Sequence, residues 1–189
     1  MTDTLLDLCG KFLIAMPSMG DERFAHSVVY LCAHSEDGAM GLVVNKPAPN
    51  IAFKELLEQL EITGAPGTRD LRVHIGGPVE HSRGFVLHGH DYTSDGGTLK
   101  VDDHVALTAT LDVLEDIAKG EGPASTLLAL GYAGWGPGQL ESELAENAWL
   151  VSDAAPEIIF SGDHDTKWLA ALQGLGIDPL TLSATGGRA

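Results

Sequence analysis

Cysteine is scarce in this chain: Cys9 and Cys32 are the two among 189 residues. This number excludes a disulfide framework and a zinc ribbon. Long hydrophobic segments are missing too, since no apolar run approaches the ~20 residues of a membrane-spanning helix. The N-terminus has Asp3 and Asp7 where a signal peptide has basic residues. We therefore expect a cytoplasmic protein without membrane contact, folded as one domain over residues 1–189 with a loose tail at 179–189.

Basic residues are the second shortage. The chain has 11 Lys and Arg against 27 Asp and Glu, a net charge of −16. Between residues 101 and 166, Lys119 is the single base beside thirteen acids. Because nucleic-acid binding requires lysines and arginines that displace counterions, we expect no nucleic-acid partner. The acidic surface is interpreted first as a solubilising feature, and alternatively as a docking face for a basic partner or a cation.

Catalytic and cofactor motifs are missing as well. The chain contains no G-x-S-x-G nucleophile elbow and no Walker lysine. A dinucleotide-binding G-x-G-x-x-G register started at Gly134 or Gly136 fails, because it meets Gln139 and Glu141. The sequence therefore predicts no catalytic residue and no cofactor.

Hydrophobic periodicity predicts an α+β fold. Short apolar or alternating segments predict strands at residues 12–16, 28–33, 41–45, 71–75, 84–90, 99–107, 126–130, 149–152 and 157–161. Helical spacing predicts about four helices, at residues 53–60, 111–117, 139–147 and around 168–172, the first of them capped by Asn50. Because the strands come mostly in hairpin-like runs, we expect a mixed, largely antiparallel sheet.

The most distinctive segment is GYAGWGPGQLESELAENAWL at residues 131–150. Its glycines permit close backbone approach, and a helix is expected to begin just after Pro137. The first turn of that helix could receive an anion, but Glu141 and Glu143 already favour the helix dipole and would repel one. Gln139, Glu143 and Asn147 share one helix face, which either lines a cleft under Trp135 or is solvated.

Two histidines and two turns are weaker signals. His88 and His90 are expected on one strand face, but a metal site needs a third ligand, so we predict that they hold no metal. Asn45 is interpreted as a turn residue at the end of a strand. Gly76 and Gly77 are interpreted first as a turn, and second as an anion-cradling loop.

Sequence blocks in a fixed order resemble the AlgH family, also called YqgE-like, of small bacterial proteins. The blocks are GKFLIAMP at 10–17 with Asp21 and Phe24, SVVYL at 27–31, GLVVNKP at 41–47, GGP at 76–78, VLH at 86–88, GYAGW at 131–135, and GQLE at 138–141 with Glu143, Asn147 and Trp149. The resemblance implies a compact single domain with a barrel-like sheet flanked by helices. It also implies a function that is largely uncharacterised: the family's name comes from a link to the regulation of alginate production, and the resemblance supplies no catalytic residues.

Ten residues form the candidate binding surface; all of them match the family blocks, and Asn147 also belongs to the polar helix face. They are Asp21, Asn45, Gly76, Gly77, His88, Trp135, Gln139, Glu141, Glu143 and Asn147. We expect a non-enzymatic binding or regulatory accessory protein whose partner is an unknown protein or small molecule. The alternative is a hydrolase-type enzyme in which Glu141 or Glu143 and His88 perform acid–base work in a cleft. Direct DNA binding is not expected.

Overall fold

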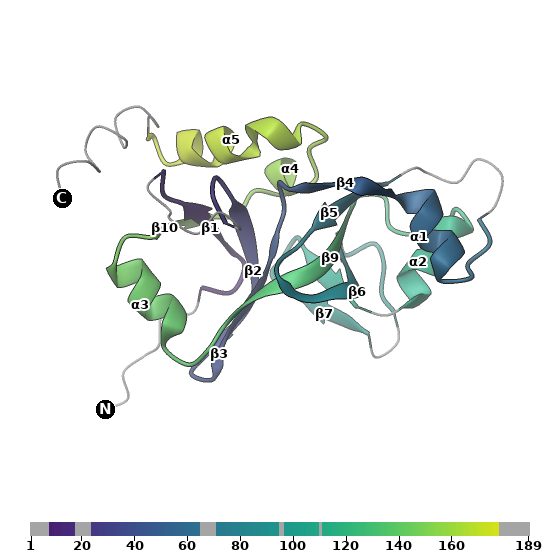
Figure 1. Cartoon of the computed structure of the whole chain (residues 1–189), viewed down its shortest axis with the longest axis horizontal. Helices are drawn as coiled ribbons and strands as arrows, with labels where there is room; N and C mark the ends of the chain where they lie inside the picture. The colour runs from purple at the N-terminus through teal and green to yellow at the C-terminus, as the bar shows by residue number, and fades with distance from the viewer. Residues whose placement is uncertain (1–7, 18–23, 65–70, 95–96, 110, 178–189) are drawn as a thin grey trace.

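Strand β9 (Thr126–Trp135) runs through the middle of a ten-stranded sheet (Figure 1). The structure is a computed structural model, and it describes residues 8–17, 24–64, 71–94, 97–109 and 111–177. Residues 127–131 of β9 are buried, as expected for a continuous apolar run in a central strand.

Nine further strands and five α-helices complete the described part of the chain. The strands are β1 (Lys11–Ala15), β2 (Val28–Ser35), β3 (Gly38–Val43), β4 (Pro47–Ala52), β5 (Arg72–Ile75), β6 (Val79–His88), β7 (Thr98–Lys100), β8 (Ala106–Thr108) and β10 (Trp149–Asp153). The helices are α1 (Phe53–Gln59), α2 (Leu111–Ala118), α3 (Gln139–Ala145), α4 (Pro156–Ile159) and α5 (Lys167–Gly174), with a 3-10 turn η1 (His164–Thr166) before α5.

The sheet curls because β9 pairs with two different groups of strands along its length. Its order is β10-β1-β2-β3-β9-β6-β8-β7, and β4 joins through β5. The end of β9 pairs with β3, while its earlier part pairs with β6 on one side and β5 on the other. The β5–β9 pair is parallel and the other pairs of the described strands are antiparallel. The result is the α+β fold with a mixed, largely antiparallel sheet that the sequence predicts.

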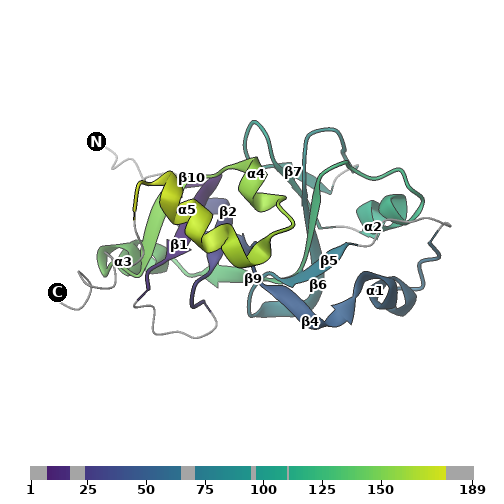
Figure 2. The ribbon, with the colours of Figure 1, turned by 90° about the horizontal axis from the view of Figure 1, so that it is seen from above.

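Three groups of buried side chains hold the helices on the sheet. Helices α4 and α5 supply Ile159, Trp168 and Leu172 to the central group, and Figure 2 shows α5 lying across β1 and β2. Helices α1 and α2 close a second group at the other end of the molecule. Helix α3 inserts the fully buried Leu140 into a third group beneath β1, β2 and β3.

Three expectations about secondary structure are wrong. Residues 99–107 do not form one strand, because β7 and β8 pair antiparallel with residues 101–105 between them. Residues 157–161 form no strand: Pro156 begins α4 after an extended Ala155, because its fixed φ suits the first position of a helix. Helix α4 joins the four expected helices, so the described residues contain five α-helices where about four were expected. Asn50 lies in β4, and the residue that precedes α1 is Ala52, which makes no side-chain cap.

Candidate functional site

Two tryptophans and one carboxylate join the end of β9 to α3 and β10. Oε1 of Glu143 accepts the indole N–H groups of Trp135 at 3.1 Å and Trp149 at 2.9 Å. The two rings meet edge to face, with centroids 6.0 Å apart. Oε2 of Glu143 accepts from Nε2 of Gln139 at 3.0 Å. We call these four residues the Trp–Glu cluster; its carboxylate satisfies two N–H groups of largely buried rings.

The chain between β9 and α3 is shaped for this cluster. Gly138 precedes the helix with a φ of 74°, a left-handed conformation that favours glycine. Oε1 of Gln139 accepts the backbone N–H of Gly136 at 2.9 Å, which ties the first helical side chain back to the turn. Leu140 is fully buried and fixes α3 on the sheet. The predicted capped helix after a tight turn is therefore present, with Gln139 closing the turn.

Glu141 has a different partner from Glu143. It contacts His34 of β2, whose side chain is 1% exposed, with 3.2 Å between Oε2 and Nε2. Nδ1 of His34 accepts the backbone N–H of Leu8 at 3.1 Å, so Nε2 is the donor to the carboxylate. This hydrogen bond holds α3 against β2 and leaves His34 no nitrogen for a ligand.

A groove of about 650 Å³ lies beside Trp135, between the β2–β3 hairpin and β6. Its floor is apolar and includes Met40, Phe85 and Tyr132. The rings of Phe85 and Tyr132 meet edge to face, with centroids 5.8 Å apart. Exposed charged side chains line the rim, namely Asp37, Glu80 and Arg83. The groove therefore offers an aromatic surface inside a charged margin.

A bulge in β6 builds one side of this groove. The five steps from Val79 to Gly84 face two steps along β9, so the chain leaves the ladder there. Glu80 and Arg83 lie in the bulged part, where they form an exposed ion pair of 3.6 Å. The Arg83 guanidinium also lies 5.2 Å from the centre of the Phe85 ring.

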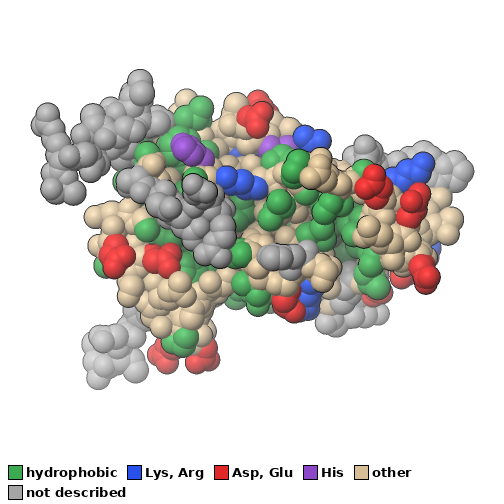
Figure 3. Space-filling view, in the orientation of Figure 1, with side chains coloured by type: hydrophobic (Ala, Val, Ile, Leu, Met, Phe, Trp, Pro, Cys, Tyr) green, Lys and Arg blue, Asp and Glu red, His purple; other side chains and the backbone are tan. Residues whose placement is uncertain are grey.

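Negative charge surrounds the groove. Acidic side chains gather over α3 and at the tip of the β2–β3 hairpin (Figure 3). Glu36 and Asp37 are exposed in the hairpin, and Glu146 is exposed at the end of α3. Among the groove-lining residues, Arg83 is the single lysine or arginine. The field at the groove therefore favours a cationic occupant.

Asn45, Gly76 and Gly77 have structural roles away from this groove. Oδ1 of Asn45 accepts the N–H of Val28 at 2.9 Å, and its Nδ2 donates to the carbonyl of His26 at 2.8 Å. Both glycines are buried, and their N–H groups do not form an exposed cradle. A Cβ at Gly77 would lie 2.1 Å from the carbonyl carbon of Tyr132, so glycine permits the close approach of this connection to β9.

His88 is a fully buried residue at the end of β6. Nδ1 lies 2.7 Å from the Gly89 carbonyl and therefore donates, so Nε2 accepts from Thr108 Oγ1 at 2.7 Å. Burial lowers the pKa of His88, which keeps the ring neutral. His90 is exposed in the following turn, so the expected shared strand face is wrong: the strand ends between the two histidines. That they hold no metal stays a prediction, supported by the two occupied nitrogens of His88.

The last two candidates are placed differently. Asp21 lies outside the described residues. Asn147 is exposed and follows the end of α3 with a φ of 60°, a left-handed conformation that asparagine tolerates. The predicted polar face therefore holds for Gln139 and Glu143, which hydrogen-bond each other, and stops before Asn147.

The hydrolase alternative requires His88 beside Glu141 or Glu143, and the fold separates them. His88 pairs with Thr126 at the start of β9, whereas α3 follows the strand's last residue, Trp135. Nine strand steps of ~3.3 Å correspond to roughly 30 Å. The structure does not bring these residues into one cleft.

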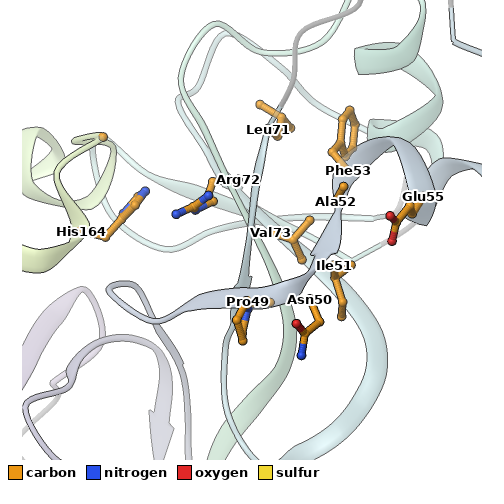
Figure 4. Close-up of a pocket in the computed structure, with 12 residues that line it drawn as sticks. Pro49, Asn50, Ile51, Ala52, Phe53, Glu55, Leu71, Arg72, Val73 and His164 are labelled. Carbon is orange, nitrogen blue, oxygen red and sulfur yellow. The ribbon is translucent and has the colours of Figure 1, made fainter.

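A second hollow, of about 650 Å³, lies between β4 and β5 and was not expected from the sequence. Figure 4 shows Arg72 and His164 on one side of it and Asn50 and Glu55 on the other. Pro47 and Pro49 give residues 47–52 the sequence of a loop before a helix. The sequence therefore predicts neither strand β4 nor the hollow beside it. The alternation of Leu71, Val73 and Ile75 with Arg72 and His74 predicts an exposed His74, but His74 is buried and Ile75 is exposed.

None of the helices in the described residues has the length and apolar character needed to cross a membrane.

Known proteins show clear similarity to the chain. The model of the AlgH-like family matches residues 12–180. A UPF0301 protein of Cereibacter sphaeroides is 58% identical over 184 residues, which cover 97% of this chain and 100% of the relative. A UPF0301 protein of Ruegeria pomeroyi is 57% identical over 185 residues, with the same coverage of both chains.

Two solved structures share the fold. The solution structure of the AlgH protein from Pseudomonas aeruginosa has a TM-score of 0.79 and 42% sequence identity, and the match covers 97% of both chains. An X-ray structure of a protein from Corynebacterium diphtheriae has a TM-score of 0.70 at 23% identity, covering 92% of this chain and 89% of that one. The second similarity concerns the fold alone.

Proposed function

The chain belongs to the AlgH-like family, as its sequence blocks predict, and we propose that it acts as a non-enzymatic binding protein. Its occupant is an extended, basic segment of a partner protein, bound in the groove between the β2–β3 hairpin and β6. Such an activity suits a regulatory accessory protein, which works by holding a partner rather than by converting a substrate.

The observation that carries this proposal is the fixed aromatic surface of the groove. Trp135 is 6% exposed, and the bond to Glu143 prevents its ring from turning. Tyr132 and Phe85 hold each other edge to face on the floor. Trp135 and the 4% exposed Phe85 are buried, and Phe85 holds the partly exposed Tyr132 in place, so a partner meets a rigid aromatic ring, whose binding carries little entropic cost.

The charge of the rim selects the occupant. Glu80 and Arg83 form an ion pair there, so the exposed Asp37 leaves the rim with a net negative charge. An acidic segment would meet repulsion from the rim and from the chain's net charge of −16. In a segment with lysines or arginines beside apolar side chains, the cations would pair with the acidic rim and the apolar side chains would pack on the floor.

The titratable groups near the groove support binding rather than catalysis. Both ring nitrogens of His34 are hydrogen-bonded, one to Leu8 and one to Glu141. Oε1 of Glu143 accepts hydrogen bonds from two tryptophans. A general acid or base needs an atom that can reach the substrate's proton. We also propose a cytoplasmic location, which is supported by the low cysteine content of the chain.

The experiment is site-specific photo-crosslinking in living bacteria. A photoreactive amino acid replaces Met40 on the groove floor, and in the control it replaces the exposed Lys54 on α1. We expect a protein adduct that forms from position 40 and not from position 54. The adduct is identified, and its binding to the purified protein is measured by calorimetry.

Charge reversal then tests the occupant. Asp37→Lys with Glu80→Lys should weaken the purified complex about tenfold or more, because both substitutions repel a basic segment. The matched control is Glu115→Lys with Glu121→Lys, which changes the net charge equally on exposed residues at and after α2. Equal adducts from both positions, or equal weakening by both charge reversals, would rule out the groove as the binding site.

A further inference from the structure

Strands β4 and β5 separate to form the second hollow. Pro47 pairs with His74 and Ala52 with Arg72, so five steps along β4 face two along β5. The residues between Pro47 and Ala52 bow away from β5, and the pocket of about 650 Å³ occupies the gap. Its volume lies within the range of pockets that bind small molecules.

His164 lines one side of this pocket, and the buried His74 is hydrogen-bonded to it from behind. His74 is 2% exposed, and its Nδ1 lies 3.3 Å from the carbonyl of Leu128, to which it donates. Nε2 of His74 is therefore an acceptor, and it lies 3.1 Å from Nδ1 of His164. Nδ1 of His164 must be the donor, so its Nε2 is left for the pocket. That atom has no hydrogen-bond partner among the described residues.

Arg72 supplies a cation beside this histidine. Figure 4 shows the side chains of Arg72 and His164 pointing toward each other from β5 and η1. Arg72 is exposed, and no carboxylate of the described residues lies within ion-pair distance of it. The planar guanidinium is suited to carboxylate and phosphate oxygens, which it can bind with two parallel hydrogen bonds.

We propose that this pocket binds a small organic molecule through a carboxylate or phosphate group, which is held between the Arg72 guanidinium and Nε2 of His164. The remainder of the ligand lies along the bowed segment of β4, where Asn50 offers an amide and Ile51 an apolar side chain. The carboxylate of Glu55 on the far side repels a second anionic group there. It can accept a hydrogen bond from a hydroxyl or an amine of the ligand.

Binding of the oxyanion is coupled to the uptake of one proton by Nε2 of His164. The neutral His164 donates from Nδ1, so Nε2 must be protonated before it can donate to an oxyanion. In the free protein the pKa of His164 is lowered, first by burial and then by the charges of Lys167 and Arg72, while Asp165 and Asp163 oppose this shift. His74 does not take the charge in its place, because burial and the neighbouring His164 and Lys167 lower the pKa of His74 to about 3. An oxyanion on Nε2 adds a close negative charge, so it raises the pKa of His164.

The test is an NMR titration of His164 in the full chain, with inorganic phosphate and acetate as probes and sodium chloride at equal ionic strength as reference. We expect at least one probe to raise the pKa of His164 saturably. Arg72→Gln should weaken that effect about tenfold. Arg83→Gln, an exposed arginine on the other groove, is the matched control and should leave it unchanged.

The two probes distinguish the kinds of oxyanion. A response to phosphate alone assigns the site to phosphate esters, and a response to acetate alone assigns it to carboxylates. If neither probe moves His164 beyond the chloride reference, or if Arg72→Gln and Arg83→Gln respond alike, the proposal fails. Neither result would affect the partner groove, which shares no residue with this pocket.

Discussion

The indole N–H of Trp135 donates to Oε1 of Glu143 over 3.1 Å. The same oxygen accepts from Trp149, so one atom connects β9, α3 and β10. Glu143 therefore acts as an internal acceptor, although its position on a polar helix face suggests a solvated acid.

The first prediction concerns removal of this acceptor. Glu143→Ala leaves two largely buried indole N–H groups without a partner, and it should cost about 2–4 kcal/mol in the free energy of unfolding. Glu143→Gln retains one carbonyl acceptor and should cost about 1 kcal/mol. Urea unfolding with near-ultraviolet circular dichroism measures both. Glu146→Ala, on an exposed residue of the same segment, is the control; an equal effect there would contradict the role of Glu143.

Trp135→Ala should destabilise the fold by about 3–5 kcal/mol, since the side chain is 6% exposed and packs in the third core group. Trp135→Phe keeps most of the packing and loses the bond to Glu143, so it should cost about half as much. Thermal unfolding of the two variants compares these losses. A melting temperature unchanged by Trp135→Ala would show that the ring contributes little to the core.

His74 predicts a loss of stability in mild acid. Burial, followed by the charges of His164 and Lys167, lowers the pKa of His74 to about 3. An unfolded histidine has a pKa of about 6.5, so between these values the unfolded chain binds a proton that the folded chain does not. Stability must fall as the pH falls through this window. His74 alone should remove about 1.5–2 kcal/mol between pH 6.5 and 5.

Urea unfolding at several pH values isolates this contribution by comparison with His74→Asn, which should flatten the dependence. The exposed His90→Asn should preserve it. Identical pH dependence in the wild type and His74→Asn would mean that the pKa of His74 does not differ between the folded and unfolded states.

Close backbone packing at Gly77 gives the fourth prediction. A Cβ there would lie within 2.1 Å of Tyr132 backbone, so Gly77→Ala must displace β9 and should cost about 3 kcal/mol or more. Gly174→Ala is the matched control in α5, where an added Cβ meets nothing within 4 Å. It should stabilise by about 0.5–1 kcal/mol, because alanine favours the helix. Chemical denaturation of both variants provides the comparison, and equal effects would contradict the packing argument.

The sequence predicts the parts of the fold that depend on local pattern. The apolar run at 126–130 gives the central strand, and the spacing of Phe53, Leu56 and Leu57 gives α1. The strand continues to Trp135 because β3 pairs with its glycine-rich end, a tertiary contact that local pattern does not encode. Residues 157–161 show the opposite failure, since Ile158 and Ile159 suggest a strand although Pro156 begins a helix.

The sites are less predictable than the fold for a similar reason. Trp135 and Glu143 could be singled out by composition, but their hydrogen bond depends on how α3 packs beside β10. His88 carries no signal that separates a buried, hydrogen-bonded ring from a ligand. The pocket of Arg72 and His164 joins residues that are 92 positions apart, through a bulge that no periodicity marks.

The central position of β9 also determines when the protein can fold during its synthesis. Strands β1 to β3, the β4–β5 pair and the group of β6, β7 and β8 are all made before residue 126. These three sets are joined through β9, so a growing chain that ends before this strand holds them as separate pieces with uncovered edges. Closure of the sheet waits for the last third of the chain, which makes this protein dependent on late, long-range pairing as it leaves the ribosome.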